Sequence, residues 1–365
     1  MNEFDVIVIG AGPAGCYAAL SAAARGCTVA LFEEHSAIGW PRHDPGWLMA
    51  SDFSESIIGS MGASVPWARV KEYRVCHAES GELIEASTRA GFIVRRDLLE
   101  KELASLAVKA GARLYLKTRV VNIIKTGDTV EGIETNSRAT PEARARIIIC
   151  ADGIRSASHG FAAKEALCKS TDPKPGISYL LANADVAPGV IEHFMSPDPL
   201  LNYKTFFTHG DGLSIFSMLS AAAFHDLRER KDNVVSRKIA NACPLEISGF
   251  ARTSAGKYGD YFSSMISGNI IFVGDASGGA GNIHGMIQGQ MAATVAASAL
   301  RDKDTGKERL SEYHELVRST LAKAPFFYFS ARKDFSSFEN WFREVEEATQ
   351  GLTASECSLP FRRFL

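Results

Sequence analysis

The chain begins with a short apolar run that ends in a glycine-rich turn. Residues 4–9 read FDVIVI, then Gly10, Gly12 and Gly15 follow in the spacing GxGxxG, and the alanine-rich stretch CYAALSAAARG comes next. An apolar run of this length bounded by glycine is typical of a buried strand, whereas alanine-rich sequence favours a helix. The pattern predicts a strand, a tight turn and a helix, in that order.

A second apolar run, TVALF, follows the predicted helix and leads into Glu33. In a dinucleotide-binding unit, the glycines permit a tight turn and let the backbone approach a pyrophosphate at the N-terminus of the helix. An acidic residue at the end of the second strand then meets the ribose hydroxyls. Because Glu33 is acidic, the site favours the unphosphorylated ribose of FAD or NAD over that of NADP.

Three later stretches place polar residues at the ends of predicted elements. Leucines on helical spacing follow Arg96 and predict a helix, and the apolar run RARIIIC predicts a buried strand that leads into Asp152 and Gly153. The apolar run NIIFV predicts a further strand, which is followed by GDASGGAGNIHG, residues 274–285. This last stretch contains Asp275 and predicts a glycine turn that opens a new helix.

In this order, the four stretches resemble the FAD-binding domain shared by aromatic-ring hydroxylases of the p-hydroxybenzoate hydroxylase type and the geranylgeranyl reductase family. The resemblance covers roughly residues 1–160 and 265–300, and the segment Ile38 to Gly46 is closer to the reductases. It implies that Arg96 faces the FAD phosphates and that Asp275 accepts from ribityl or ribose hydroxyls. The residues predicted to bind FAD are Gly10, Gly12, Gly15, Glu33, Arg42, Arg96, Asp152, Gly153, Asp275, Gly279 and Gly281.

Two histidines are candidates for catalysis. His284 lies one turn into the helix that begins at Gly281, where an imidazole could donate a proton or bind substrate. His43 follows a segment that, in this fold, passes near the flavin and the substrate mouth, and the neighbouring Arg42 could hold a phosphate or a substrate anion. The alternatives are a buried structural histidine at 284 and a solvated turn at PRHDPG.

Short β-like runs alternate with turns between residues 179 and 218, which predicts an antiparallel sheet. In the fold implied by the resemblance, such a sheet roofs the flavin. Because side chains alternate across a sheet, only every second residue faces a substrate, and core packing is the alternative for each. The candidates to line a substrate cavity are Phe194, Tyr203, Phe206, Phe207 and Phe216.

We therefore expect an α/β protein with a Rossmann-like FAD-binding domain, a discontinuous antiparallel substrate domain and a helical C-terminal region. The predicted boundaries are 1–70, 90–160 and 265–300 for the first, 71–89 and 161–264 for the second, and 301–365 for the third. Within the last region, Phe335, Phe338, Trp341 and Phe342 fall on one helical stripe. The segment 325–349 could contact a membrane surface or a partner protein, or pack onto the main body.

Charge and composition exclude several other classes of protein. The chain has 40 basic and 42 acidic residues, a net charge of -2 and no basic stripe, which argues against nucleic acid as a partner. The N-terminus is unlike a signal peptide, so we expect a cytoplasmic protein. The seven cysteines include no CxxC pair, and no cluster of residues has the spacing of a metal site.

The leading interpretation is an FAD-dependent oxidoreductase in which reduced flavin transfers a hydride to a C=C bond of an apolar, prenyl-like substrate. One alternative is a monooxygenase that hydroxylates an aromatic substrate through a C4a-hydroperoxide. Another is a flavoprotein that modifies or partners a second polypeptide. Since only one complete GxGxxG unit is present, electrons would come from transiently bound NAD(P)H or from a protein donor.

Overall fold

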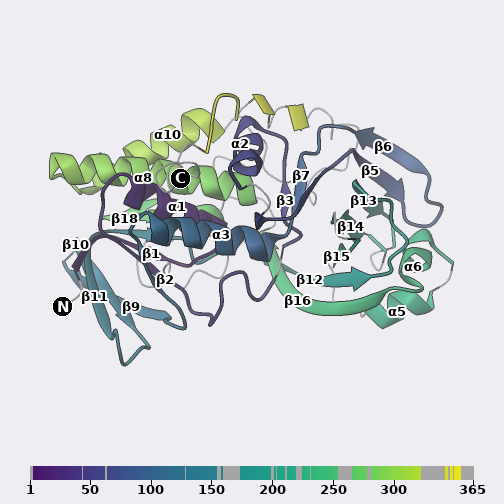
Figure 1. Cartoon of the computed structure of the whole chain (residues 1–365), viewed down its shortest axis with the longest axis horizontal. Coiled ribbons are helices and arrows are strands. Elements are labelled where there is room, and N and C mark those ends of the chain that lie inside the picture. The colour runs from purple at the N-terminus through teal and green to yellow at the C-terminus, as the bar shows by residue number, and fades with distance from the viewer. Residues whose placement is uncertain are drawn as a thin grey trace.

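The structure is a computed structural model of the chain. It describes residues 3–42, 44–61, 64–127, 129–153, 158, 173–198, 201–202, 204–209, 212–218, 224–230, 232–253, 265–277, 281–321, 342–343, 346–347 and 349–354. Two halves lie side by side: the first sheet with its long helices, and a second sheet with two short helices (Figure 1). The predicted α/β class is confirmed.

The first sheet is built on parallel strands that carry the predicted glycine turns. Its strands run in the order β17, β18, β11, β1, β2 and β8, with the β9–β10 hairpin joined to β11. Pairing is parallel from β18 to β8 and antiparallel between β17 and β18. The strands are β1 (Glu3–Ile9), β2 (Val29–Phe32), β8 (Arg113–Tyr115), β9 (Val120–Thr126), β10 (Thr129–Thr135), β11 (Glu142–Cys150), β17 (Ile266–Ser267) and β18 (Ile270–Phe272).

Long helices cover one face of the first sheet. Val6 and Val8 of β1 join the core under these helices, whereas Ile7 and Ile9 join a second core beneath the β9–β10 hairpin. This alternation is what a strand buried on both faces requires. The helices are α1 (Pro13–Ala24), α2 (Asp52–Met61), α3 (Arg96–Lys109), α8 (Asn282–Asp302), α9 (Lys307–Leu310) and α10 (Glu312–Leu321), and η3 (Gly274–Ser277) precedes α8.

The closest helix packing joins α1 to α8. A Cβ added at Gly289 of α8 would lie 2.5 Å from the Ala14 carbonyl oxygen and 3.0 Å from the Ala18 amide nitrogen of α1. Only a residue without a Cβ permits this approach of the two backbones. The start of α8 is thereby held beside the glycine turn that opens α1.

The second sheet runs in the order β16, β12, β15, β14, β13, β5 and β6. The antiparallel pairing predicted for residues 179–218 is present, but β13 and β5 pair in parallel. These two strands are far apart in the chain, so no hairpin forces them to be antiparallel. The strands are β5 (Glu72–His77), β6 (Leu83–Ser87), β12 (Pro173–Ala182), β13 (Val190–Met195), β14 (Lys204–Thr208), β15 (Ser214–Met218) and β16 (Cys243–Thr253).

The two faces of the second sheet pack against different elements. One face meets α5 (Phe224–Glu229) and α6 (Val234–Ile239). The other face packs against a small sheet of β3 (Trp47–Leu48), β4 (Trp67–Arg69) and β7 (Phe92–Val94). The pairing brings residues 72–87 and 173–253 into one sheet. Where one domain ends and the next begins stays a prediction.

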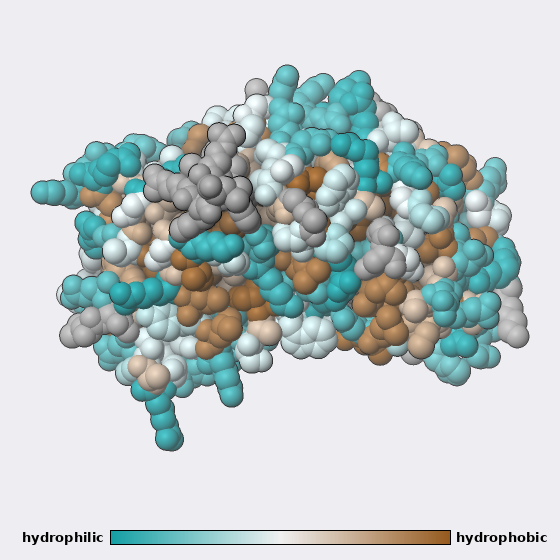
Figure 2. Space-filling view, in the orientation of Figure 1, coloured by the Kyte–Doolittle hydropathy of each residue, from teal (hydrophilic) through white to brown (hydrophobic). Residues whose placement is uncertain are grey.

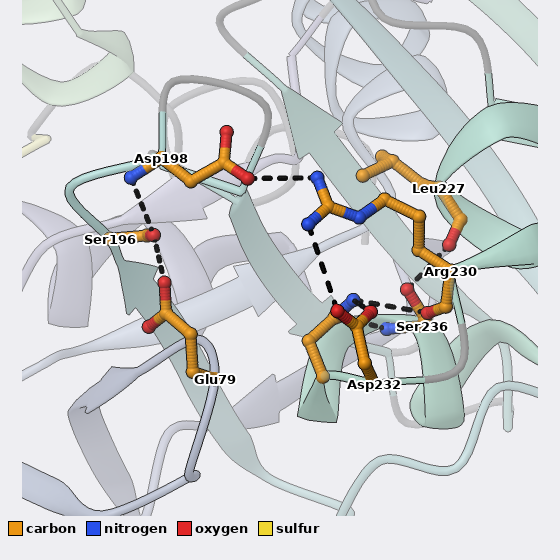
Figure 3. Close-up of polar contacts among 8 residues, drawn as sticks. Glu79, Ser196, Asp198, Leu227, Arg230, Asp232 and Ser236 are labelled. Carbon is orange, nitrogen blue, oxygen red and sulfur yellow. Dashed lines mark hydrogen bonds and ion pairs between the residues drawn. The ribbon is translucent and has the colours of Figure 1, made fainter.

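A polar network ties the loop after β13 to the neighbouring turns (Figure 3). Ser196 Oγ donates to the Glu79 carboxylate in the β5–β6 turn, and the Asp198 amide donates to Ser196 Oγ at 2.9 Å. Arg230, after α5, donates to Asp198 at 2.8 Å, and Asn233 caps α6. The network ties residues 196–198, which follow β13, to the β5–β6 turn and to the end of α5.

Lys204 at the start of β14 is fully buried. Its Nζ donates to the Asn202 carbonyl oxygen at 2.8 Å. Burial lowers the pKa of Lys204 to about 8, although the negative charge of Asp198 opposes this shift. Burying a protonated amine in this way costs stability at neutral pH.

The surface of the face seen in Figure 2 is mixed. Apolar side chains gather in separate patches among polar ones. Among the described residues, no helix is both long and apolar enough to span a membrane. Of the predicted C-terminal stripe, Phe335, Phe338 and Trp341 lie outside the described residues, whereas Phe342 is buried.

We expect Gly289→Ala to lower the free energy of unfolding by about 1–3 kcal/mol, because the added methyl overpacks the contact between α1 and α8. Urea denaturation followed by circular dichroism measures the change. Gly59→Ala is the matched control: this glycine also lies in a helix, α2, but its Cβ would meet no atom within 4 Å. That variant should be unchanged or stabilised by up to about 1 kcal/mol. Equal effects of the two substitutions would contradict the packing argument.

We expect Lys204→Met to raise the free energy of unfolding at about pH 7 by about 1–3 kcal/mol, because methionine has no charge that loses its hydration on burial. The folded pKa of Lys204, about 8, lies below the ordinary value of 10.5. The unfolded chain therefore binds more protons between these values, and wild-type stability recovers as the pH rises through them. Urea titrations of both proteins at about pH 7 and about pH 10 should show the advantage of the variant shrink. A difference that does not depend on pH would refute this account.

Candidate functional site

The glycines of the first turn have different structural roles, close packing or open space. A Cβ at Gly10, which has φ +94°, would lie 2.5 Å from the Ala151 carbonyl oxygen, and a Cβ at Gly15 would lie 1.9 Å from the Gly10 carbonyl oxygen. A Cβ at Gly12 would meet nothing within 4 Å, and Gly12 caps α1 without a side-chain hydrogen bond. Gly10 and Gly15 therefore serve packing, whereas Gly12 leaves open space at a helix N-terminus that can receive a phosphate.

Glu33 follows β2 and reaches the same turn. Its Oε2 accepts from the Ala11 amide at 2.9 Å, and its Oε1 accepts from the His35 amide at 2.9 Å. The His35 Nδ1 also lies 2.6 Å from Oε1. These bonds orient the carboxylate beside Gly10 and Gly12, where it retains lone pairs for a hydroxyl ligand.

Asp152 follows β11, next to the end of β1. The Ala151 amide donates to the Ile9 carbonyl oxygen at 2.8 Å, which sets the two strand ends side by side. The Ser158 amide donates to Asp152 Oδ2 at 3.0 Å, while Oδ1 is buried and no described residue bonds it. Gly153 has φ +75°, which lets the chain turn away at this point. A buried carboxylate oxygen without a protein donor is suited to a ligand hydroxyl.

Arg96 opens α3 within a group of carboxylates. Its Nε lies 2.6 Å from Glu100 Oε1 and its Nη1 lies 3.8 Å from Asp44 Oδ1. Burial lowers the pKa of Arg96, but the charges of Glu100, Asp44 and Asp275 outweigh burial and raise it. The structure thus brings the predicted residues Arg96 and Asp275 close enough to interact.

The pattern of the sequence did not identify Asp44 as a site residue. Asp44 Oδ1 accepts from the Gly46 amide and from Asn282 Nδ2, both at 2.8 Å. It therefore joins the loop after β2 to the first residue of α8 and to Arg96. The stretch PRHDPG contains Asp44, but the sequence predicted Arg42 and His43 from it instead. His43 lies outside the described residues.

Arg42 connects the two halves of the molecule. Its Nη2 lies 3.1 Å from Glu246 of β16 and 3.4 Å from Asp97 of α3, and the side chain is buried. Burial raises the pKa of Asp97, but hydrogen bonds from Arg95 and the charge of Arg42 outweigh it, so the pKa is lowered. No described residue bonds Arg42 Nε or Nη1, and both are buried. These donors can serve an anion, although the two carboxylates already offset the charge of Arg42.

The N-terminus of α8 lacks a side-chain cap. Gly281, with φ +98°, caps the helix without a side-chain hydrogen bond, and the first turn contains no acidic residue. Asp275 in η3 is exposed, and His284 in the first turn of α8 is buried. Gly279 lies outside the described residues. The positive end of α8 can therefore stabilise negative charge on a bound group.

The aromatic candidates divide between the two faces of the second sheet. Phe194, Phe206 and Phe216 pack with Phe224 under α5 and α6, and Phe206 stacks on Phe216 at 4.5 Å between ring centroids. Phe207 faces the small sheet instead. Tyr203 lies outside the described residues. Among the candidates that the structure describes, Phe207 alone joins the face that packs toward the first half.

That face carries an apolar cluster, which we call the central cluster. Trp47 stacks on Tyr73 with ring centroids 5.5 Å apart and lies 6.1 Å from Phe207. Its residues are Trp47, Met49, Val70, Tyr73, Val75, Ala90, Ile93, Leu180, Ile191, Met195, Phe207, Ile215 and Phe342. Asn282 Nδ2 donates to the Trp47 carbonyl oxygen at 3.2 Å, so the cluster adjoins the start of α8.

His193 was also missed by the sequence analysis. It is buried on the strand between Ile191 and Met195 of the central cluster, and its Nδ1 lies 2.6 Å from Thr205 Oγ1. Alternation along VIEHFM could have placed it on the face opposite Phe194. Its position adds a polar group beside an otherwise apolar surface.

The residues present fit FAD. The N-termini of α1 and α8 lack side-chain caps, Gly12 leaves open space, and Asp152 offers a buried acceptor oxygen. Phosphates suit the helix N-termini, and ribose or ribityl hydroxyls suit Glu33 and Asp152. Among the described residues, no group of His, Cys, Asp and Glu could hold a metal ion.

Comparisons with known proteins agree with this reading. The model of the family "FAD dependent oxidoreductase" matches residues 5–154. Digeranylgeranylglycerophospholipid reductase from Methanocella arvoryzae is 28% identical over 340 residues, covering 88% of this chain and 85% of the relative. Digeranylgeranylglycerophospholipid reductase 1 from Methanosphaera stadtmanae is 29% identical over 343 residues, covering 86% and 80%.

Solved structures show the same fold. A geranylgeranyl bacteriochlorophyll reductase-like protein from Thermoplasma acidophilum superposes with a TM-score of 0.73 at 21% identity, covering 98% of this chain and 90% of that one. A myxobacterial FAD-dependent chondrochloren halogenase has a TM-score of 0.70 at 18% identity, covering 100% and 90%. A reductase-like protein and a halogenase therefore share this fold.

We expect Glu33→Gln to weaken FAD binding by about tenfold or more, because a charged acceptor for a ribose hydroxyl becomes neutral. Quenching of flavin fluorescence during reconstitution of the apoprotein gives the dissociation constant. Glu34→Gln is the matched control, since Glu34 is exposed and pairs with Arg119 at the surface. Equal affinities for FAD in the two variants would show that Glu33 does not bind the cofactor.

Proposed function

We propose that this chain, an FAD-dependent oxidoreductase related to the geranylgeranyl reductases, reduces a carbon–carbon double bond of an apolar, prenyl-like substrate. The observation that carries the proposal is the position of the central cluster. Trp47 belongs to this cluster and is also hydrogen-bonded to Asn282 at the start of α8. An apolar chain packed against the cluster would therefore lie next to the end of the helix that faces the cofactor.

The chemistry divides between the cofactor and the protein. Bound FAD supplies the hydride, and the protein must hold the double bond in place and deliver a proton to its second carbon. The side chains of the central cluster are buried, so an apolar chain would have to enter between them, and removal of its surface from water would favour that binding. The curated relatives named above are reductases of a geranylgeranylated lipid, which supports a substrate of this class.

Four groups around the start of α8 would hold FAD. Gly12 and the N-terminus of α1 would receive the pyrophosphate, Glu33 would accept from the ribose, and Asp152 and Asp275 would accept from other hydroxyls. Arg96 remains charged among its carboxylate neighbours and provides positive potential close to Asp275. The uncapped N-terminus of α8 favours the negative charge of the reduced flavin.

His284 is the proton donor in this proposal. It lies in the first turn of α8 and is shielded from solvent. An imidazole near neutral pH can both donate a proton and regain it. Electrons reach the flavin from NAD(P)H that docks transiently, or from a protein donor, since the GxGxxG unit occurs once in the chain.

The direct test is anaerobic. The holoprotein is reduced, mixed with a geranylgeranylated phospholipid in detergent micelles prepared in D₂O, and the lipid is analysed by mass spectrometry. The proposal expects reoxidation of the flavin and a lipid that gains two hydrogen atoms, at least one of them solvent deuterium, in each saturated double bond, with no added oxygen. A second sample receives a phenol and oxygen in place of the lipid. If the flavin stays reduced with the lipid but the phenol is hydroxylated in the second sample, the protein is the monooxygenase instead.

We expect His284→Gln to slow reoxidation of the reduced flavin by the lipid about 10²-fold or more, without loss of bound FAD, because the general acid is removed. Stopped-flow absorbance gives this rate, and the rate of flavin reduction should not change. His225→Gln is the control, because His225 is exposed on α5. A wild-type reoxidation rate in the His284 variant would give this histidine a structural role only.

A further inference from the structure

Gln288 lies in the second turn of α8, and its side chain bonds back to η3. Its Oε1 accepts from the Gly274 amide at 2.6 Å. Ser277 Oγ lies 3.1 Å from the same oxygen and 2.7 Å from the Gly274 carbonyl oxygen, so it can donate to either. The side chain of Gln288 therefore holds the η3 turn, which carries Asp275, against α8.

The nitrogen of this amide, Gln288 Nε2, has no hydrogen-bond acceptor among the described residues. Gln288 is 1% exposed, and no described residue accepts a hydrogen bond from its Nε2. The orientation of the amide is fixed, because the Gly274 N–H can only donate and must face the oxygen. A buried NH₂ without an acceptor costs free energy, and such groups in proteins normally have a partner.

Three elements of the cofactor site meet at this amide. A Cβ at Gly274 would lie 3.0 Å from Ala14 Cβ at the start of α1, and a Cβ at Gly285 would lie 3.3 Å from the same atom. The turn of η3, the glycine turn of α1 and the first turns of α8 therefore converge within a few ångströms. FAD held by these turns would offer phosphate, hydroxyl and carbonyl oxygens, all of which are hydrogen-bond acceptors.

We propose that Gln288 is a positioning residue for FAD with two separate tasks. Its oxygen holds the Gly274–Ser277 turn, and with it Asp275, against α8. Its Nε2 donates to an oxygen acceptor of the bound cofactor. The proposal requires that the chain binds FAD, and it does not depend on a prenyl-like substrate, so its failure and that of the proposed function are distinguishable.

The substitution Gln288→Glu separates the two tasks. It keeps an oxygen for the Gly274 amide and replaces the NH₂ group with a second oxygen. When the new carboxyl is ionised, it repels a cofactor oxygen, whereas the protonated form again has a donor. We expect the FAD dissociation constant to rise about tenfold or more at about pH 8, and to recover toward wild type at about pH 5.5.

Two further variants complete the experiment. Gln288→Met removes both tasks and should lower affinity at both pH values. Gln290→Glu makes the same chemical change two residues along α8, where the side chain bonds to the Thr353 carbonyl oxygen instead. This control should bind FAD as the wild type does. Thermal unfolding of each apoprotein shows whether the turn and helix remain folded.

The readouts are the FAD dissociation constant and the midpoint potential of the bound flavin, neither of which requires turnover. A pH-dependent loss of affinity in Gln288→Glu, together with a midpoint potential at about pH 8 that is more negative than that of the wild type at the same pH, supports the proposal. Wild-type affinity in Gln288→Glu at both pH values overturns it. Losses that are equal in Gln288→Glu and Gln288→Met at both pH values also overturn it, because the amide would then serve only to hold the turn.

Discussion

The close approach of α1 and α8 is the constraint on which the rest of the structure depends. It requires a residue without a Cβ at Gly289, where the backbone of one helix presses on that of the other. Since each helix starts at a glycine turn, their packing sets the distance between the two turns. The strand ends that carry Glu33, Asp152 and Asp275 are then arranged around these turns by parallel pairing of β2, β1, β11 and β18.

Charge in the site is balanced locally. Arg96 is surrounded by Glu100 and Asp44, and Arg42 by Asp97 and Glu246. Burying either arginine without these partners would be costly, because an isolated buried charge loses its hydration. The same pairs also have a structural role, since Arg42 links the first half of the molecule to β16. Electrostatics and domain arrangement are therefore coupled in this protein.

The sequence predicted those features that depend on residues close together in the chain. The strand, turn and helix at Gly10–Gly15 follow from a local pattern, and the structure has them where that pattern places them. The FAD cofactor and the relation to geranylgeranyl reductases are likewise supported by the comparisons. The individual FAD and substrate residues stay predictions, with His43, Tyr203 and Gly279 outside the described residues.

What the sequence did not predict depends on distant contacts. Arg42 and Glu246 are 204 positions apart, and no periodicity connects them. Phe206 and Phe207 must take opposite faces because they are neighbours in β14, but a run of aromatic residues does not show which of them packs against α5 and α6. Gln288 was hidden for another reason: glutamine is common on helix surfaces, and its burial and its bond to Gly274 arise only from tertiary packing.

The order of β18 and α8 along the chain has a consequence for biosynthesis. Both belong to the half of the molecule built around β1, yet they begin only at Ile270 and Asn282. A ribosome that has released β1, α1 and β2 has therefore produced a sheet with an open edge and a helix with an uncovered face. That half closes only after the entire second sheet has been synthesised, so this protein cannot complete its folding one domain at a time as its chain emerges.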